Sequence, residues 1–312
     1  MSRQFGRVAQ LIVGPDSGQG SLDVSALRIT FSIQNATVAS PKTATFRIYN
    51  LKPETAQRFN NEFTRVQFSA GYEDPGPQQL FVGEIAIVRQ SRRDVDTYVE
   101  ILCQDGDKAY NYGTVSDSLA AGWTPDDVYA SLLKALQPYG ITAGNKPTFS
   151  TEAGQRGYVL YGMVHAYLGT LAAAQNCDWY IEDGKLNFVP KKDTLPGAIV
   201  VLTSATGLLG VPEQTVDGIS ATCLLNPAIK AGGKVQIDNA SIASAQLNAS
   251  AYLGTDVPFF AGTDKDGFYK SLCVTHSGDT RGDDWTTNLI CIAVDGTAPV
   301  GGPTLEAVPD GN

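Results

Sequence analysis

The side chains best suited to acid–base chemistry in this sequence are its two histidines, His165 and His276. Ser277 and Asp279 follow His276 closely, so the three residue types of a serine-hydrolase triad stand together. Adjacent residues of an extended strand point to opposite faces, so His276 could not activate Ser277 there. The G-x-S-x-G motif of α/β-hydrolases is absent as well. The run is therefore interpreted as a polar strand end, and catalysis is not expected.

The spacing of potential metal ligands matches neither a calcium loop nor the usual zinc motifs. Asp279, Asp283 and Asp284 surround Arg281, but they do not form the D-x-D-x-D-G pattern of a calcium loop. Neither C-x-x-C nor H-x-x-x-H occurs. The cysteines are scattered and odd in number, as is typical of buried thiols in a reducing cytoplasm: Cys103, Cys177, Cys223, Cys273 and Cys291. We expect a solvated loop at the aspartates, and neither a metal nor a cofactor.

Charge and hydropathy argue against tight binding to a nucleic-acid backbone and against a membrane-spanning segment. The chain of 312 residues has a net charge of −9, and the acidic excess lies in residues 210–312. An acidic surface disfavours binding to a phosphate backbone, which depends on lysine and arginine contacts. No run of about 18 apolar residues occurs, so no membrane segment is expected. With 43% hydrophobic and 18% charged residues, the composition is typical of folded domains.

Two predicted strands, Leu27–Asn35 and Thr43–Asn50, show the clearest pattern in the chain. Apolar and polar residues alternate along both, which is typical of a sheet with one buried face. A turn at Ala39–Pro41 joins them, and Pro53–Asn60 is predicted to be a short helix that begins at its proline. The polar side chains of the two strands form the candidate functional surface: Arg28, Thr30, Ser32, Gln34, Thr45, Arg47 and Tyr49.

The pattern of elements divides the chain into three domains. Residues 1–112 contain six short predicted strands with regular turn signals, which favour an antiparallel barrel or sandwich. Residues 113–198 predict a small α+β domain. Residues 199–296 return to strands, with a loop insertion at residues 239–266, and residues 297–312 are expected to be a flexible tail.

The middle domain has the most explicit start and stop signals. Thr124 is a predicted N-cap, and Pro125 stands at the first position of the helix that follows it. A second helix is predicted over Val164–Gln175. Asp183-Gly184 between two alternating runs predicts a tight β-hairpin, because both turn residues tolerate positive φ.

Three segments of the sequence carry a resemblance to a known family. They are Thr43–Phe59, Asn176–Gly184 and a closing region that includes Gly210–Glu213, Leu225–Pro227 and Val274–Thr280. In this order they resemble the baseplate hub proteins of tailed phages, relatives of the late-control tail proteins of contractile-tailed phages. The resemblance implies a mainly β fold, in which two tube-type antiparallel β-barrel domains bracket a middle α+β domain.

The resemblance also implies a structural function. Hub proteins of this kind form a homotrimer, a pseudo-sixfold ring that joins the tail tube to the central spike and lets DNA pass through its lumen. The implied partners are the tail tube protein, the central spike protein, the tape-measure protein and other baseplate proteins, without sequence-specific binding of nucleic acid. The protein is expected in the tail baseplate of the virion, after assembly in the host cytoplasm. The candidate surface would then line the lumen or a subunit interface.

Two alternatives are left open by the sequence. A carbohydrate- or receptor-binding β-protein of a phage tail would use loops that carry tyrosine and aspartate. A cell-wall hydrolase would use His276 or a pair of facing carboxylates. The candidate surface could also be an ordinary solvent-exposed strand face.

Overall fold

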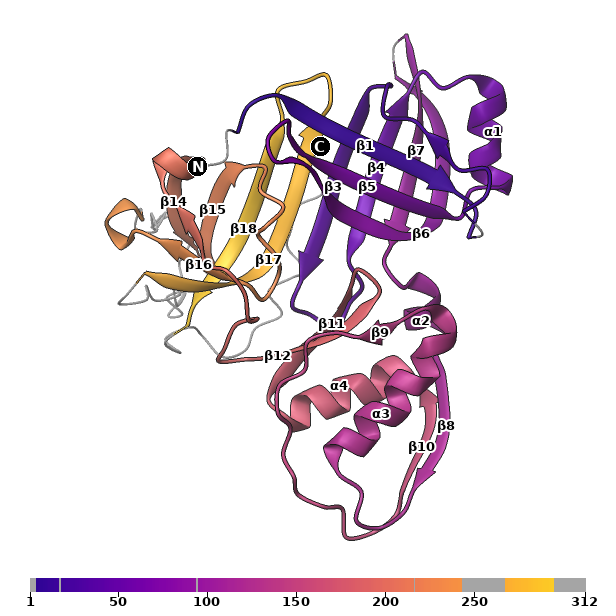
Figure 1. Ribbon diagram of the computed structural model, residues 1–312, viewed down its shortest axis with the longest axis vertical. Coiled ribbons are helices and arrows are strands. Elements are labelled where there is room, and N and C mark those ends of the chain that lie inside the picture. Colours follow the sequence, from indigo (N-terminus) through magenta and orange to yellow (C-terminus); the bar gives the residue numbers. More distant parts are fainter. Residues whose placement is uncertain (1–3, 17, 94, 216, 243–266, 295–312) are drawn as a thin grey trace, which may run out of the picture.

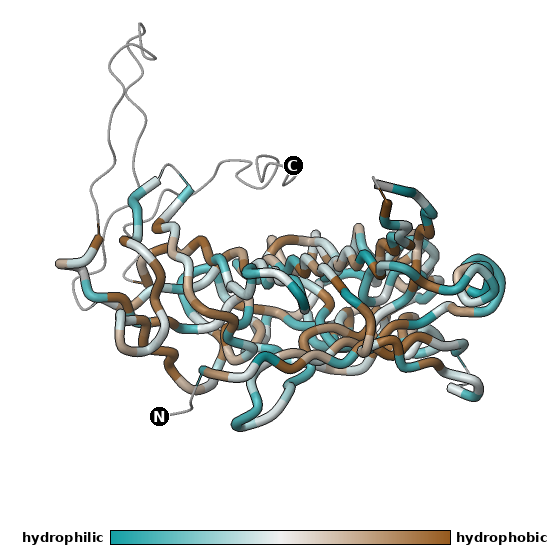
Figure 2. The backbone as a smooth tube through the Cα atoms, turned by 90° about the horizontal axis from the view of Figure 1, so that it is seen from above, coloured by the Kyte–Doolittle hydropathy of each residue, from teal (hydrophilic) through white to brown (hydrophobic). Residues whose placement is uncertain are grey.

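The computed structural model of the protein describes residues 4–16, 18–93, 95–215, 217–242 and 267–294. Figure 1 shows two strand-rich units side by side and a smaller, helix-bearing unit that projects from them. Seen from above in Figure 2, the described chain forms a layer that is broader than it is deep. The tail expected at residues 297–312, and residues 243–266 of the expected insertion, lie outside the described residues.

The first unit is an antiparallel sheet with one short helix. Its elements are β1 (Arg7–Gly14), β2 (Leu22–Asp23), β3 (Ile29–Ala36), β4 (Thr43–Tyr49), α1 (Pro53–Asn61), β5 (Arg65–Tyr72), β6 (Gly76–Arg93) and β7 (Asp96–Gln104). In space the strands follow the order β3-β4-β7-β6-β5-β1-β2. Their alternation buries Phe31, Phe46 and Phe68, whose rings pack in tilted pairs with centroids 4.6 Å (Phe31–Phe68) and 5.0 Å (Phe46–Phe68) apart. The helix begins at Pro53, as predicted, and covers this core with Phe59.

The middle unit contains the longer helices. Its elements are α2 (Asp107–Tyr112), β8 (Thr114–Leu119), α3 (Pro125–Leu136), β9 (Thr142–Ala143), β10 (Tyr158–Met163), α4 (Val164–Ala174), β11 (Cys177–Glu182) and β12 (Lys185–Pro190). Thr124 and Asp127 form a capping box that starts α3. The predicted hairpin joins β11 and β12, and both Asp183 (φ 53°) and Gly184 (φ 67°) adopt positive φ at its turn.

The last unit repeats the strand order of the first. Its elements are β13 (Val200–Leu202), β14 (Leu208–Thr215), β15 (Gly218–Leu224), β16 (Lys234–Ile237), β17 (Phe268–Asp279) and β18 (Trp285–Ala293). The spatial order is β14-β15-β18-β17-β16-β13, and that of the first unit is β3-β4-β7-β6-β5-β1. In chain order, β13 to β18 correspond one by one to β1, β3, β4, β5, β6 and β7. The units differ at one end, where β13 pairs with β16 in parallel and β1 pairs with β5 antiparallel.

A seam of hydrogen bonds joins the two units into one sheet. The second half of β17, Cys273–Asp279, pairs antiparallel with β3 over seven residue pairs, from Cys273↔Ala36 to Asp279↔Thr30. On the buried side of the sheet, Trp285 of the last unit packs edge-on against the Phe31 ring, with 5.3 Å between the ring centroids, and belongs to the core of the first unit. The two units are therefore held together by both backbone pairing and a shared core.

A buried ionic cluster fixes the middle unit to the first. Lys42, in the connection between β3 and β4, places its Nζ 3.1 Å from Oε1 of Glu182 and 3.5 Å from Oδ1 of Asp183, at the tip of the β11–β12 hairpin. Asp105 accepts a hydrogen bond from the backbone N–H of Gly184 on the same tip. Burial by itself would lower the pKa of Lys42, but the carboxylates around it outweigh burial and raise the pKa, so the lysine stays charged.

The mainly β class with a small α+β insert is confirmed, as is a large antiparallel sheet. Barrel closure is not detected, since within the described residues the outer strands of neither unit pair with each other. The division into domains at residues 112 and 198 stays a prediction. Strands β8, β10 and β14 were not predicted: β8 is almost entirely polar, and β14 contains Gly210 and Pro212, which are ordinarily turn residues.

Candidate functional site

The predicted polar residues of β3 and β4 lie on one face of the sheet. Thr30 pairs directly with Arg47 across the two strands, and Ser32 pairs with Thr45. The neighbouring residues in sequence, such as Ile33 and Phe46, are buried on the other face. All seven predicted residues are partly or fully exposed: Arg28, Thr30, Ser32, Gln34, Thr45, Arg47 and Tyr49. The alternation therefore placed these residues on the exposed face of the strands, and their assignment to a lumen or a subunit interface stays a prediction.

The polar face continues across the seam into the last unit. Ser277 of β17 stands opposite Ser32, and Thr275 stands opposite Gln34. Beyond β17, these rows of directly paired residues extend to Thr286 and Asn288 of β18 and then into β15. On the other side they extend through Glu100 of β7 to Arg89 of β6. We call this surface, which runs over the eight strands from β14 to β6, the polar face.

Ion pairs within the chain neutralise most charges at the centre of the polar face. The Arg28 guanidinium donates to both carboxylate oxygens of Asp279, with Nη2 2.7 Å from Oδ2, and lies 4.8 Å from the Tyr49 ring. Nε of Arg47 lies 2.7 Å from Oε1 of Glu100. Burial alone would raise the pKa of Asp279. The hydrogen bonds and charge of Arg28, together with hydrogen bonds from the backbone of Arg281 and Gly282, outweigh burial, and the pKa falls below its usual value.

A shallow hollow of about 710 Å³ lies at the centre of this face, beside the seam. Hydroxyl groups and paired charges dominate its lining, including those of Thr30, Ser32, Thr45 and Ser277. Such a surface can be wetted and can exchange hydrogen bonds with water, but it offers few groups that could react.

His276 does not form a catalytic triad. Its side chain is buried, and its Nδ1 lies 2.9 Å from the Thr287 hydroxyl. Ser277 points to the polar face, where its hydroxyl contacts that of Thr286 at 3.2 Å, and Asp279 pairs with Arg28. Burial lowers the pKa of His276 to about 3, so this imidazole is neutral at physiological pH. The interpretation of this run as polar residues of a strand is supported.

The other potential reactive groups are also structural. Nδ1 of His165 lies 3.0 Å from the Tyr110 carbonyl, and the two rings stack with centroids 4.9 Å apart. The five cysteines are buried free thiols. Over the described part of the chain, no three His, Cys, Asp or Glu side chains are grouped as metal ligands. No helix in that part is long and apolar enough to cross a membrane.

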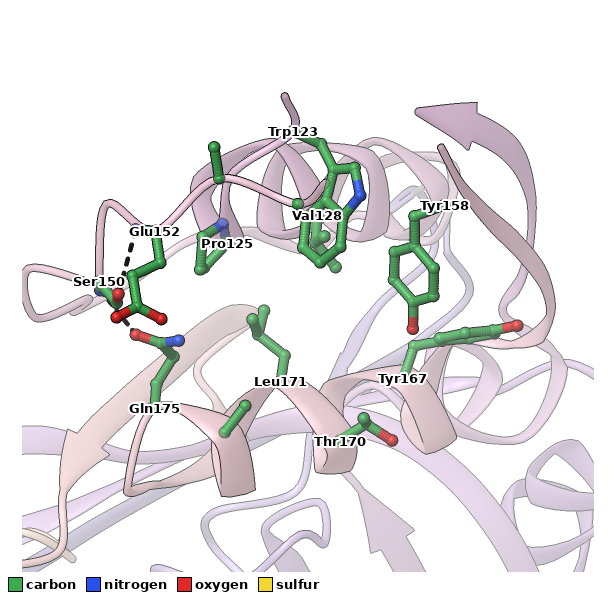
Figure 3. A pocket seen from close by; sticks show the side chains of 13 residues that line it. Trp123, Pro125, Val128, Ser150, Glu152, Tyr158, Tyr167, Thr170, Leu171 and Gln175 are labelled. Atoms are coloured by element: carbon green, nitrogen blue, oxygen red, sulfur yellow. Dashed lines mark hydrogen bonds between the residues drawn. The ribbon is translucent and has the colours of Figure 1, made fainter. Parts of the chain in front are cut away.

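A second hollow, of about 390 Å³, lies in the middle unit between α3, α4 and the loop before β10. Figure 3 shows the rings of Trp123, Tyr158 and Tyr167 at one end and the polar side chains of Glu152 and Gln175 at the other. The indole of Trp123 stacks on Tyr158, 4.9 Å between centroids, and donates through Nε1 to the Arg156 carbonyl. The Tyr158 ring thus occupies one face of the indole, and the indole N–H already has a hydrogen-bond acceptor.

The sequence identified only the part of the polar face that lies at β3 and β4. Thr275, Ser277, Thr286 and Asn288 were not predicted as site residues. The same alternation with buried neighbours, such as Val274 and Leu289, marks their strands in the sequence. That signal could have identified them, but nothing local indicates that β17 lies beside β3.

Comparison with known proteins gives one family. Residues 15–272 match the family model described as Baseplate hub gp41. A comparison with curated proteins finds no match.

Several solved structures share the fold at very low sequence identity. The 43 kDa tail protein of prophage MuSo2 from Shewanella oneidensis has a TM-score of 0.58 and 8% identity, over 94% of this chain and 98% of that one. The tail protein from Neisseria meningitidis MC58 has a TM-score of 0.53 and 11% identity, over 92% and 96%. A chain of the half-lidded Francisella PdpA-VgrG complex has a TM-score of 0.55 and 8% identity, over 97% of this chain and 60% of that one. At such identities the similarity concerns the fold alone.

Proposed function

This chain belongs to the baseplate hub gp41 family, and from that membership we propose that three copies form a pseudo-sixfold ring that joins the tail tube to the central spike. The repeated strand order supports the proposal, because each copy would contribute two equivalent sheets. Three copies with two sheets each match a sixfold tube on one side and a threefold spike on the other. The role is structural, without catalysis or a cofactor.

The observation that carries this proposal is the polar face, which continues across the seam from the first unit into the last. A ring through which DNA passes needs an inner wall that is hydrated but does not hold phosphates. The polar face meets this need, because Arg28 and Arg47 are already paired with Asp279 and Glu100. Paired arginines release fewer counterions on contact with DNA than free ones, so the DNA would pass without being trapped.

We assign the seven residues predicted from the sequence to the lumen wall of this ring. The wall would then comprise Arg28, Thr30, Ser32, Gln34, Thr45, Arg47, Tyr49 and their neighbours on β17 and β18. The partners in this proposal are the tail tube protein, the central spike protein, the tape-measure protein and other baseplate proteins. The proposed location is the baseplate of the virion, with assembly in the host cytoplasm.

The domain division predicted from the sequence fits this role. The three cores support it: the first is built mainly from residues before 104, the second from residues 109–188 and the third from residues 202–293. We propose that the first and last units form the ring and that the middle unit stands outside the polar face.

Electron microscopy and thiol labelling test the proposal together. Negative-stain class averages of the purified chain, at high concentration after mild cross-linking, should show a threefold ring with a central hole. The variant Ser32→Cys places a reactive thiol on the polar face, while the natural cysteines stay buried. In the ring, a small maleimide should label it and a maleimide on a polymer wider than the hole should not.

Three results would count against the proposal. Compact monomers under all conditions contradict the ring. Equal labelling by the small and the large maleimide contradicts a position in the lumen. Protection from both reagents would place Ser32 at a subunit interface instead.

A further inference from the structure

The sheet of this chain ends in two strands that each lack a partner on one side. From β14 to β6, the eight strands β14-β15-β18-β17-β3-β4-β7-β6 pair in succession. Within the described residues, β14 pairs only with β15, and the second half of β6, from Ile87 on, pairs only with β7. An unpaired strand edge is a template for another strand. The exposure of these edges is high, with Ile87 44% and Val211 61% exposed.

The repeat inside the chain indicates what the two edges bind. β17 and β6 are equivalent strands, and each has a bulge against its neighbour, between Ser271 and Cys273 in one and between Ile85 and Ile87 in the other. Before the bulge, β17 pairs with β16 and β6 pairs with β5. After the bulge, β17 pairs with β3. The strand equivalent to β3 is β14, so the missing partner of β6 is a β14.

That β14 cannot come from the same chain, because β6 and β14 lie at opposite ends of the eight-strand row. We infer that the second half of β6 pairs with β14 of a neighbouring copy, in the same way as β17 pairs with β3 within one copy. The inference rests on the proposed ring and names the surfaces that close it. All seven successive pairings from β14 to β6 are antiparallel, so the two edge strands run in opposite directions. If the symmetry axis of the ring runs along the strands, rotation from one copy to the next leaves strand direction unchanged, so β6 and the neighbour's β14 are antiparallel too.

The equivalence also fixes the register. The bulges align the two units, because the first paired residue after the bulge is Ile87 in β6, opposite Leu102, and Cys273 in β17, opposite Ile290. Leu102 pairs with Thr45, which pairs with Ser32, and Ile290 pairs with Ser220, which pairs with Glu213. Glu213 is therefore equivalent to Ser32.

On the other edge, Leu102 pairs with Ile87 and Ile290 pairs with Cys273. Ile87 is thus equivalent to Cys273, and Ser91 to Ser277. Because Ser277 stands opposite Ser32 at the internal seam, Ser91 of one copy stands opposite Glu213 of the next.

Charge is complementary at this register. Arg89 would stand two residues along β6 from Ser91, diagonal to Glu213, and a long side chain spans that separation. Arg89 and Glu213 are both exposed, and neither has an ion-pair partner in the described part of the chain. The three-residue bulge of β14 between Leu209 and Glu213, which contains Pro212, limits the edge to a short segment. Such bulges prevent indiscriminate strand pairing.

A disulfide trap tests the inference at single-residue precision. Directly opposed residues of an antiparallel pair have Cα atoms about 4.5–5.5 Å apart, within the range that a disulfide requires. The double variant Ser91→Cys/Glu213→Cys should give covalent species of two and three chains on non-reducing gels after mild oxidation. Ser32→Cys/Ser277→Cys is the matched positive control, since it should cross-link within one chain. Gln90→Cys/Glu213→Cys is the negative control, because Gln90 points to the opposite face.

Charge reversal supplies a second readout that does not depend on oxidation. Arg89→Glu should raise the concentration at half assembly by about tenfold or more, because like charges then meet across the joint. The double swap Arg89→Glu/Glu213→Arg should restore assembly.

The outcomes separate this inference from the ring itself. Threefold rings without intermolecular cross-links, with a working positive control, overturn the β6–β14 joint and leave the hub function standing. The same holds if the double swap assembles no better than Arg89→Glu alone. A wild-type chain that stays monomeric overturns both.

Discussion

Replacing Lys42 with methionine is the most severe single test of how the middle unit is held. The Lys42 side chain is 6% exposed and that of Glu182 8%, so neither charge is stabilised by bulk water. Removing the lysine leaves a buried carboxylate without its partner, which costs about 3–5 kcal/mol in proteins. We expect Lys42→Met to lower the free energy of unfolding by that amount, or roughly two to four decades in the unfolding equilibrium constant.

Urea denaturation followed by tryptophan fluorescence measures this change. Trp123 and Trp179 belong to the middle core and Trp285 to the first core, so the emission reports on both. Because Lys42 connects these units, the variant should unfold in two steps, with the middle unit first. Adding Glu182→Gln should recover most of the loss, since the unpaired charge is then removed.

A matched control defines what would refute the reasoning. Lys146 forms an ion pair with Asp126 on the surface, where their side chains are 28% and 60% exposed. Lys146→Met should cost less than about 1 kcal/mol. If Lys42→Met costs as little as this control, or if the double variant is as unstable as Lys42→Met alone, the cluster does not hold the units together.

Three further predictions concern pH and packing. Burial raises the pKa of Asp105 to about 7, above its unfolded value of 3.8, so between these values the folded protein keeps a proton on Asp105 that the unfolded chain releases. The stability that this bound proton contributes is lost as pH rises from about 4 to 7. Asp105→Asn should flatten that part of a melting-temperature profile. Burial lowers the pKa of His276 to about 3, so its contribution is present above pH 6.5 and lost on acidification; His276→Gln should flatten the acid side. A Cβ on Gly278 would lie 2.7 Å from atoms of both Phe31 and Trp285, so Gly278→Ala should cost about 1–3 kcal/mol in urea unfolding.

The sequence predicted local features well, and the reason is visible in particular residues. Alternation along β3 and β4 identified the polar face, because each strand has one buried side. Pro53, Thr124 and Asp183-Gly184 marked helix starts and a hairpin turn, since each acts within a few residues of backbone.

Two of the features that were missed depend on residues far apart in the chain, and a third on residues within one strand. The seam between β17 and β3 is tertiary pairing, and no local pattern in either strand encodes its neighbour. Burial of Lys42 depends on carboxylates of the distant β11–β12 hairpin, whereas a lone lysine in a turn ordinarily indicates solvent exposure. The edge strand β14 stayed hidden because its bulge requires the glycine and proline that ordinarily indicate a loop.

The covalent link between the two sheet units changes the kinetics of building a closed assembly. Were the units separate chains, a six-unit ring would require five associations in solution before the last joint closed it, each opposed by lost translational and rotational entropy. In this chain, the β17–β3 joint forms as the protein folds, at an effective concentration set by the tether rather than by expression level. In the proposed ring, three of the six joints would then need no diffusional search. Fewer kinds of incomplete ring could form, and the ring would assemble at a lower concentration of subunits.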